Sequence, residues 1–198
     1  MALDRALLMA NLDSFYDFED KVVLCVGTGR GQLLDPNIAT AETVVIDRDE
    51  KTLAGRNTPR INSGTQGQGR TVVADFMDIN IPGDVVYFEF CLHEMDDSKQ
   101  AILHARTLAP DVVIFEHSPS SDWVFYAGEE EQVCRSAQAL AHFPVKRRLH
   151  VCAEQTFKDH AELVAKLSTQ GDLAIQRASR FAGVTNIVIP MKCNLALL

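Results

Sequence analysis

The sequence predicts an α/β fold in which helices cover both faces of a mostly parallel sheet. Two observations lead to this fold class. Five short runs rich in Val, Ile and Phe recur along the chain with little polar alternation, which is typical of strands buried on both faces. Segments with helical character separate the runs, and this alternation indicates right-handed crossovers between parallel strands. We therefore expect one doubly wound sheet.

The first two thirds of the chain supply the parallel part of this sheet. Within residues 1–20, Leu3, Leu7 and Ala10 fall on one helical face, which predicts an amphipathic N-terminal helical segment. The expected strands are Val22–Val26, Thr43–Ile46, Thr71–Ala74, Val85–Phe90 and Val112–Phe115. The expected helices are Gln32–Ile38, Glu50–Arg56, Ser98–Leu108 and Glu129–Phe143. Ser98 is the candidate N-cap of the third helix.

The C-terminal third has a different pattern. Asp159–Gln170 reads as an amphipathic helix closed by Gly171. Two β-like runs follow, Ala174–Phe181 and Val184–Met191, and the two residues between them include a glycine, which predicts a hairpin. We expect this antiparallel hairpin at one edge of the sheet. With 198 residues, 46% of them hydrophobic, the chain is long enough for one sizeable core, so we expect residues 1–198 to form a single domain.

Composition limits the classes of partner. The formal net charge is −8 and the pI is about 5.2, which argues against nucleic-acid binding, because that needs clustered Lys and Arg. No stretch approaches the ~18 to 20 apolar residues that span a bilayer. The five cysteines include no CxxC pair and no zinc-like spacing. These features predict a cytoplasmic protein without nucleic-acid or membrane partners.

A glycine-rich loop follows the first expected strand. In "VVLCVGTGRG", Gly27, Gly29 and Gly31 allow the backbone to approach a ligand closely. Dinucleotide-binding loops favour GxGxxG, whose last glycine lies inside the helix. Here the glycines run GxGxG, and Gln32 follows them. The loop alone therefore leaves open whether the ligand carries a pyrophosphate.

Acidic residues follow the next strands. Asp47 lies 20 residues beyond Gly27, where a carboxylate can bind both ribose hydroxyls of an adenosine, although it can also cap the next helix. Asp75 is placed to accept from an adenine amino group while Phe76 packs on the ring; the alternative is a capping Asp. Because ligands of open α/β sheets sit at the carboxyl ends of the strands, such acids would repel a pyrophosphate and favour a cation. The residue types point to a sulfonium nucleoside.

Four motifs carry a family resemblance. In order, "VVLCVGTGRG", "VVIDRDE", "VVADFMDI" and "DVVYFEFCLHEM" resemble the cofactor motifs of the class I, seven-stranded S-adenosylmethionine-dependent methyltransferases. The likeness covers roughly residues 22–116. It implies a Rossmann-like sheet of seven strands, the cofactor S-adenosylmethionine, and a C-terminal antiparallel pair. The resemblance also implies a set of cofactor-binding residues: Gly27, Gly29 and Gly31 along the methionine part, Asp47 and Arg48 at the ribose, Asp75 and Phe76 at the adenine, and Glu89 and Phe90 near the amino group.

The acceptor side depends on weaker signals. His93 and His117 follow the fourth and fifth strands and are candidate bases that would titrate near neutrality, although either can simply cap or pack. Trp123 and Tyr126 lie in "SPSSDWVFYAGEE", an aromatic segment suited to roof a substrate pocket. The same segment would also serve as a lid on the sheet edge or as the contact of a homodimer. No metal site is expected, since the local spacing of acids and histidines matches none.

The leading hypothesis is therefore a transferase that methylates a small molecule. Aminocarboxypropyl transfer or intramolecular cyclisation would use the same cofactor on the same fold. A nicotinamide-dependent oxidoreductase is an alternative from another class. A non-catalytic binding protein is the fourth, because Cys25 stands where many members of the family carry an acid.

Overall fold

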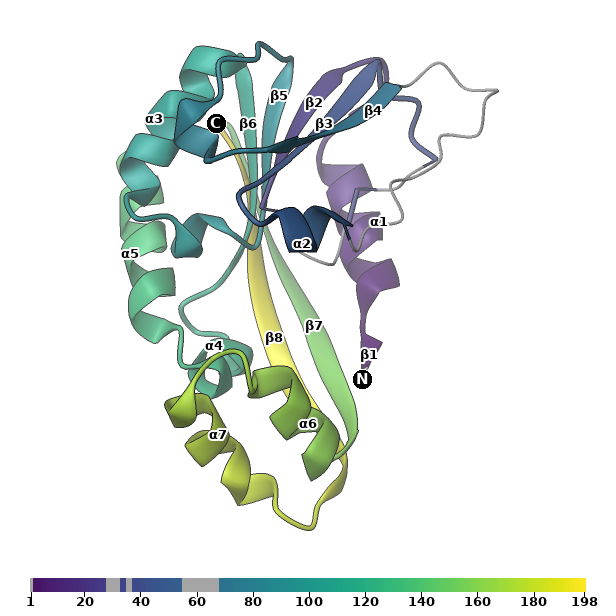
Figure 1. Ribbon diagram of the computed structural model, residues 1–198, viewed down its shortest axis with the longest axis vertical. Helices are drawn as coiled ribbons and strands as arrows, with labels where there is room; N and C mark the ends of the chain where they lie inside the picture. The colour runs from purple at the N-terminus through teal and green to yellow at the C-terminus, as the bar shows by residue number, and fades with distance from the viewer. Residues whose placement is uncertain (1, 28–32, 35–36, 55–67) are drawn as a thin grey trace.

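The computed structural model describes residues 2–27, 33–34, 37–54 and 68–198 (Figure 1). Its strands form one sheet in the order β1-β7-β8-β6-β5-β2-β3-β4. The strands are β1 (Ala2–Leu3), β2 (Val22–Val26), β3 (Glu42–Asp47), β4 (Gln68–Val73), β5 (Val85–Glu89), β6 (Asp111–His117), β7 (Arg147–Asp159) and β8 (Thr185–Leu197). The helices are α1 (Arg5–Phe15), α2 (Glu50–Ala54), α3 (Ser98–Leu108), α4 (Asp122–Ala127), α5 (Glu130–Leu140), α6 (His160–Leu167) and α7 (Asp172–Ala178), with short 3-10 turns η1 (Phe76–Asp78), η2 (Leu92–Glu94) and η3 (Ser179–Phe181).

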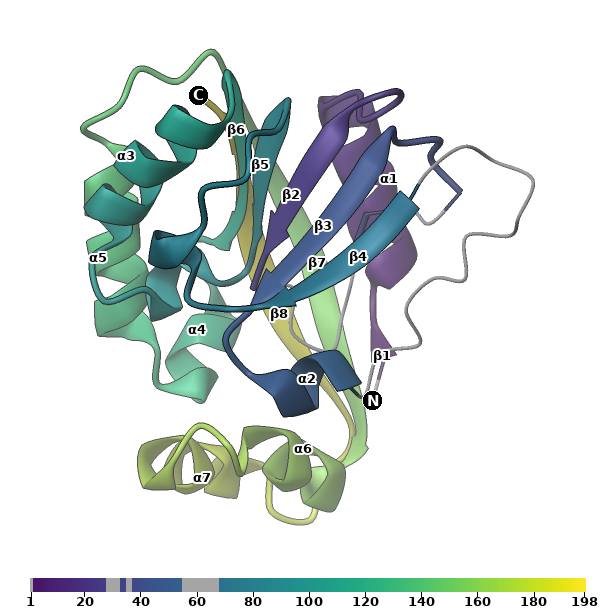
Figure 2. The ribbon, with the colours of Figure 1, turned by 45° about the horizontal axis from the view of Figure 1, so that its top comes forward.

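The pairing confirms the predicted fold class. Strands β4, β3, β2, β5 and β6 pair in parallel, whereas β8 runs antiparallel to both β6 and β7. The chain reverses its direction across the sheet between β2 and β5 (Figure 2), which is the switch point where ligands of such sheets bind. The two-residue β1 pairs with β7 and adds an eighth strand at that edge.

The parallel strands are buried on both faces, as their continuous apolar runs predicted. In β2, Val23 packs into the core beneath α1, whereas Leu24 packs into the core beneath α3. Tyr87 and Phe88 divide between the two cores in the same way in β5. The sheet therefore carries one hydrophobic core on each face.

Several expected helices form where the sequence placed them. The N-terminal helical segment is α1, whose N-cap Asp4 accepts a hydrogen bond from the Leu7 N–H. Helix α3 spans Ser98–Leu108, but its N-cap is Asp97, which accepts from two backbone N–H groups, and not Ser98. In the expected helix Gln32–Ile38, residues 32, 35 and 36 lie outside the described residues and the other four are not helical.

The C-terminal hairpin was predicted with the wrong first strand. Ala174–Phe181 is helical, because it forms the end of α7 and η3. The partner of β8 is β7, which pairs with it from Arg147 to Asp159. In β7, buried and exposed side chains alternate, so its apolar residues are diluted by charged ones. A continuous apolar run, the signal of the parallel strands, is therefore absent from β7.

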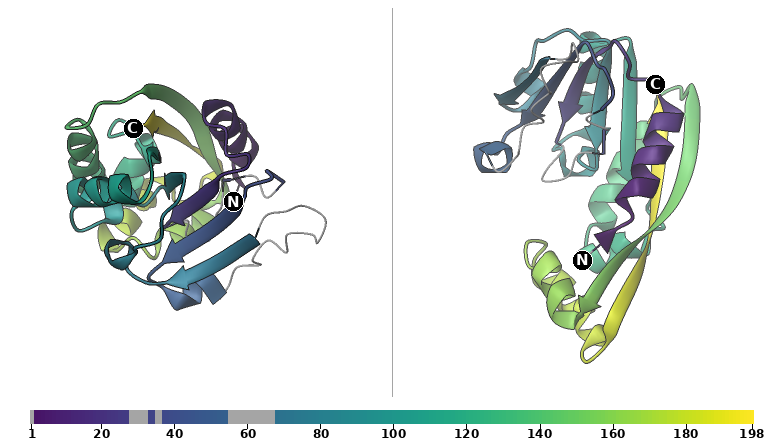
Figure 3. Two further views of the ribbon diagram at one scale, coloured as in Figure 1. Left: turned by 90° about the horizontal axis from the view of Figure 1, so that it is seen from above. Right: turned by 90° about the vertical axis from the view of Figure 1, so that its right-hand side faces the viewer.

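The ribbon of β7 and β8 extends beyond the parallel strands and carries α6 and α7 at its far end (Figure 3). Helix α4, which lies in the aromatic segment that contains Trp123 and Tyr126, contacts β8 and α7. These helices and the strand ends surround the site described next. Of the helices in the described part of the chain, none has the length and apolar character to cross a bilayer.

Candidate active site

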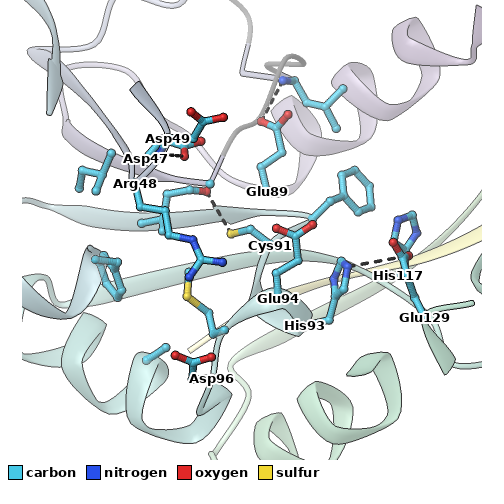
Figure 4. A pocket seen from close by; sticks show the side chains of 18 of the residues that line it. Asp47, Arg48, Asp49, Glu89, Cys91, His93, Glu94, Asp96, His117 and Glu129 are labelled. Carbon is cyan, nitrogen blue, oxygen red and sulfur yellow. Dashed lines mark hydrogen bonds and ion pairs between the residues drawn. The ribbon is translucent and has the colours of Figure 1, made fainter. Parts of the chain in front are cut away.

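A cavity of about 630 Å³ lies at the carboxyl ends of the parallel strands (Figure 4). Residues after β2, β3, β4 and β5 line one part of it. The other part is lined by side chains from α4, α6, the β7–β8 ribbon and the N-terminal segment. The cavity therefore combines the switch point of the sheet with a wall built from the C-terminal third.

Gly27 fixes the close contact between two strand ends. Its φ is +60°, and a Cβ built on it would lie 2.3 Å from the Cβ of Cys91. Its N–H donates to the Ile46 carbonyl at 3.0 Å, and the Cys91 thiol donates to the Val26 carbonyl at 3.2 Å. Only glycine fits here. Gly29 and Gly31 lie outside the described residues.

Asp47, Arg48 and Asp75 all line the cavity, as the resemblance implies. Asp47 accepts a hydrogen bond from the Asp49 N–H at 2.9 Å, and Asp75 accepts one from the Met77 N–H at 2.9 Å. Asp75 is therefore the N-cap of η1, the alternative that the sequence left open. Asp47 accepts within its own turn and does not cap α2, because the Lys51 N–H in the first turn of that helix donates to Asp49. Both carboxylates line the cavity while they make these hydrogen bonds.

Phe76, Glu89 and Phe90 also line the cavity, and each makes a further contact with a neighbouring segment of the chain. Phe76 is buried, with its ring centroid 5.2 Å from that of Phe88. Glu89 is buried and accepts from the Leu33 N–H at 2.9 Å, which ties β5 to the segment after the glycine loop.

Phe90 has a φ of 49°, a left-handed conformation that is strained for a phenylalanine. Its N–H donates to the Phe115 carbonyl at 2.8 Å, and its ring lies 4.6 Å from the imidazole of His117. The backbone turn after β5 is thus held against β6, and it places an aromatic face beside His117.

A buried charge cluster lies beside Phe90. His93 Nδ1 lies 2.8 Å from Glu116 Oε1, and the His93 N–H donates to the other oxygen of Glu116 at 3.1 Å. On the far side of the ring, His93 Nε2 lies 3.8 Å from Glu129 Oε2. His93 therefore sits between two carboxylates from β6 and from the start of α5.

This geometry moves the pKa values of the two histidines apart. Burial lowers the pKa of His93, but the hydrogen bond and charge of Glu116, with Glu129 and Glu94, raise it to about 9. For His117, burial dominates and lowers the pKa to about 4, although the charge of Glu116 opposes this. The expectation that both titrate near neutrality is corrected: at pH 7 His93 is a cation and His117 is neutral.

The acceptor-side residues differ in where they lie. Trp123 lines the cavity, and its indole stacks 6.2 Å from Phe157. The structure does not bring Tyr126 to the cavity; its ring packs 5.3 Å from Phe181. Glu129 lines the cavity and was not predicted, because its segment has no strand-end or motif signal. Among the described residues, no three His, Cys, Asp or Glu side chains are placed to hold a metal ion.

We expect the stability of the folded chain to be greatest near pH 6.5. Between about pH 6.5 and 9 the folded chain keeps a proton on His93 that the unfolded chain has released, so stability falls as pH rises. Between about pH 6.5 and 4 the unfolded chain carries a proton on His117 that the folded chain lacks, so stability falls as pH falls. Each effect amounts to roughly 1–3 kcal/mol.

Urea unfolding at pH 5, 6.5 and 8.5 measures this dependence. His93→Gln should flatten the alkaline side, and His117→Asn should flatten the acidic side, in each case relative to the unaltered chain. An alkaline side that is equally steep in His93→Gln would mean that His93 is not the group responsible.

Solved structures show similar folds at low sequence identity. A proposed methyltransferase of Bacillus halodurans matches with a TM-score of 0.64 and 16% identity over 98% of this chain and 97% of its own. The plantazolicin methyltransferase BpumL, solved with S-adenosylhomocysteine and a triazolic desmethylPZN analogue, matches with a TM-score of 0.53 and 15% identity over 97% of this chain and 84% of its own. A proposed RNA methyltransferase of Pyrococcus horikoshii matches with a TM-score of 0.59 and 13% identity over 98% of this chain and 82% of its own.

Neither the protein-family models nor the curated proteins compared with this sequence give a match. At the identities found among solved structures, the likeness shows the fold alone. It agrees with the strand order observed here and with the four motifs read in order along the sequence. The chain has the Rossmann-like fold of the class I S-adenosylmethionine-dependent methyltransferases.

Proposed function

We propose that this chain binds S-adenosylmethionine in the cavity and transfers its methyl group to a small molecule. The observation that carries the proposal is the charge of the cavity wall at the switch point. Eight carboxylates line the cavity: Asp47, Asp49, Asp75, Glu89, Glu94, Asp96, Asp97 and Glu129. Such a wall favours a sulfonium cation and disfavours the pyrophosphate of a dinucleotide.

The cofactor-binding residues follow from the strand ends. Asp47 and Arg48 lie at the ribose position after β3, and Asp75 with Phe76 lies at the adenine position after β4. The methionine part would pass the turn at Gly27 and the backbone at Glu89 and Phe90, with Gly29 and Gly31 of the same loop. When bound, S-adenosylmethionine supplies an electrophilic methyl group.

His117 is the proposed base for an acceptor that must lose a proton. It is neutral at pH 7, lines the cavity and lies against Phe90. With S-adenosylmethionine bound, His117 would take the proton that the acceptor loses when it receives the methyl group and S-adenosylhomocysteine leaves. The charge lost by the sulfonium would then reappear on the His117 imidazole, whose protonated form the charge of Glu116 favours. His93 is already protonated, so its role is to hold the cluster and not to take the proton.

A small acceptor suits the shape and charge of the site. Trp123 of α4 and Lys166 of α6 contribute to the wall opposite the strand ends, so the acceptor lies beneath these helices. The net charge of −8 disfavours nucleic acid as acceptor. The acceptors of the solved neighbours differ among themselves, so the fold by itself does not choose one.

Asp47→Ala is expected to weaken binding of S-adenosylhomocysteine by about 1–3 kcal/mol, because it removes the acceptor of the ribose hydrogen bonds. Titration calorimetry measures the loss. Asp78→Ala is the matched control, since Asp78 is an exposed acid on η1 that does not line the cavity. Equal affinity of both variants would place the ribose elsewhere.

Product analysis separates the alternatives. With S-adenosylmethionine and an acceptor, methyl transfer yields S-adenosylhomocysteine, whereas aminocarboxypropyl transfer or cyclisation yields methylthioadenosine. A thermal shift with NADPH but none with S-adenosylhomocysteine would favour an oxidoreductase. If the folded protein binds neither NADPH nor S-adenosylhomocysteine, a non-catalytic role would be favoured.

A further inference from the structure

The cavity is divided by charge. Seven of its eight acids lie at or after the ends of β3, β4 and β5, and the eighth, Glu129, is the N-cap of α5. The described lining residues that carry positive charge beside these seven acids are Arg48 and the protonated His93. The wall contributed by the N-terminal segment, α6 and the ribbon has the opposite character: it carries Arg5 and Lys166 but no carboxylate among the described lining residues. The two ends of the cavity therefore suit ligands of opposite charge.

Lys166 is the central cation of the second end. It projects from α6, and among the described residues it makes no hydrogen bond or ion pair, although the same cavity contains eight carboxylates. Its charge acts on the groups at the acceptor end. Burial is the main cause of the low pKa of His117, and the charges of His93 and Lys166 lower that pKa further. Burial raises the pKa of Glu129, the lining acid at the start of α5, and the charge of Lys166 acts against this shift.

Gln155 supplies a second donor at this end. It lies on β7, lines the cavity and is only 7% exposed. Its Nε2 donates to Met191 Sδ at 3.6 Å, and a thioether is a weak acceptor. A buried amide satisfied only by sulfur gains a stronger hydrogen bond when an oxygen anion replaces that partner.

We propose that this end of the cavity binds a carboxylate of the methyl acceptor, with Lys166 Nζ and Gln155 Nε2 as its donors and Trp123 against its apolar body. The proposal rests on the proposed function for the position of the cofactor, and it adds the class of acceptor: a small, largely apolar acid. The carboxylate lies at Lys166, and the atom to be methylated lies at His117 and Phe90.

The donors indicate a carboxylate over other charged groups. An ammonium would be repelled by Lys166 and drawn to the acids of the cofactor end, where it would compete with the sulfonium. A phosphate dianion would leave excess negative charge, because one lysine and one amide match a single charge. A carboxylate offers two oxygens, one for each donor.

A charge series on one scaffold tests the proposal. The probes are 3-(4-hydroxyphenyl)propanoate, its primary amide, and 3-(4-hydroxyphenyl)propylamine, which share ring and chain and carry charges of −1, 0 and +1. Binding to the full chain saturated with S-adenosylhomocysteine is measured by calorimetry and ligand-observed NMR. We expect the acid to bind at least roughly fivefold more tightly than the amide, a ratio set by one partly exposed charged hydrogen bond, and the amine to bind most weakly.

Two variants assign the effect. Lys166→Gln should bring the acid-to-amide ratio close to one while the affinity for S-adenosylhomocysteine stays unchanged. Lys192→Gln is the matched control: Lys192 is exposed on β8, beside Met191 but on the opposite face, and does not line the cavity. Lys166 and Lys192 are both exposed. Near-UV circular dichroism checks that both variants keep the fold.

The outcomes separate the two proposals. If folded wild-type chain does not bind S-adenosylhomocysteine, the proposed function fails. If it binds S-adenosylhomocysteine but binds the amide or amine as tightly as the acid, or does not bind the acid, the carboxylate site is overturned and the proposed function stands. An unchanged acid-to-amide ratio in Lys166→Gln would also overturn the assignment.

Discussion

Gly27→Ala is expected to destabilise the folded chain by roughly 2–5 kcal/mol and to abolish measurable cofactor binding. Two costs add at this position. A non-glycine residue at a φ of +60° is strained, and the new Cβ would lie 2.3 Å from the Cβ and 2.6 Å from the Sγ of Cys91. Relief of the clash must separate the end of β2 from the segment after β5, which is the place where the methionine part would bind. Urea unfolding and calorimetry with S-adenosylhomocysteine measure the two effects.

A control and a rescue separate these costs. Gly171→Ala also places an alanine at a positive φ, +99°, but no atom lies within 4 Å of its Cβ, so it should cost only about 1 kcal/mol. In a Cys91→Gly background the atoms that meet the new Cβ are absent, and Gly27→Ala should then cost little more than Gly171→Ala. An equally large cost in that background would show that contact with Cys91 is not the cause.

The parallel half of the fold was predictable because its physical signal is local. Strands such as β2 and β5 are buried on both faces, so each reads as an unbroken apolar run, and the loop after β2 contains the glycine that the turn requires. Strand β7 gives a weaker signal. Only alternate residues such as Val151 and Phe157 are buried, and the exposed residues that alternate with the buried ones include His150, Glu154 and Lys158.

The C-terminal error has a related cause. The run 174–181 contains enough apolar residues to suggest a strand, but Ala174 and Ala178 are both fully buried and are spaced four residues apart, which is the period of a helix. The four-residue spacing of these buried alanines, and not the apolar content of the run, indicates α7 and leaves β7 as the partner of β8.

The site was predictable in its cofactor half and not in its acceptor half. Asp47 and Asp75 are found by their order after consecutive strands, since the topology brings parallel strand ends together. The protonation of His93 depends on contacts with Glu116 and Glu129, which lie 23 and 36 positions away in sequence and approach through β6 and α5. No local pattern encodes those distances, so the sequence identified two histidines without their charges.

The buried pair itself gives the last test. Glu116→Ala is expected to cost about 3–5 kcal/mol, because it leaves the His93 imidazole buried without its closest counter-charge. Glu130→Ala breaks the 2.7 Å ion pair with Arg177, in which the Glu130 side chain is 40% exposed, and should cost less than about 1 kcal/mol. Similar costs for the two variants would mean that burial does not govern the pair at His93.

The protonation of His93 provides a second readout of the pair. In the unaltered chain the Glu116 carboxylate outweighs burial and raises the pKa of His93 to about 9. In Glu116→Gln, whose side chain has nearly the same shape, burial acts with less opposition and the pKa of His93 should fall by one unit or more, as measured by NMR titration. Because the charge of Glu116 also raises the pKa of His117, this substitution removes support for a proton on either histidine. The proposed base requires a charged His93 beside a neutral His117. This combination therefore depends on Glu116, which is not among the residues proposed to contact the acceptor.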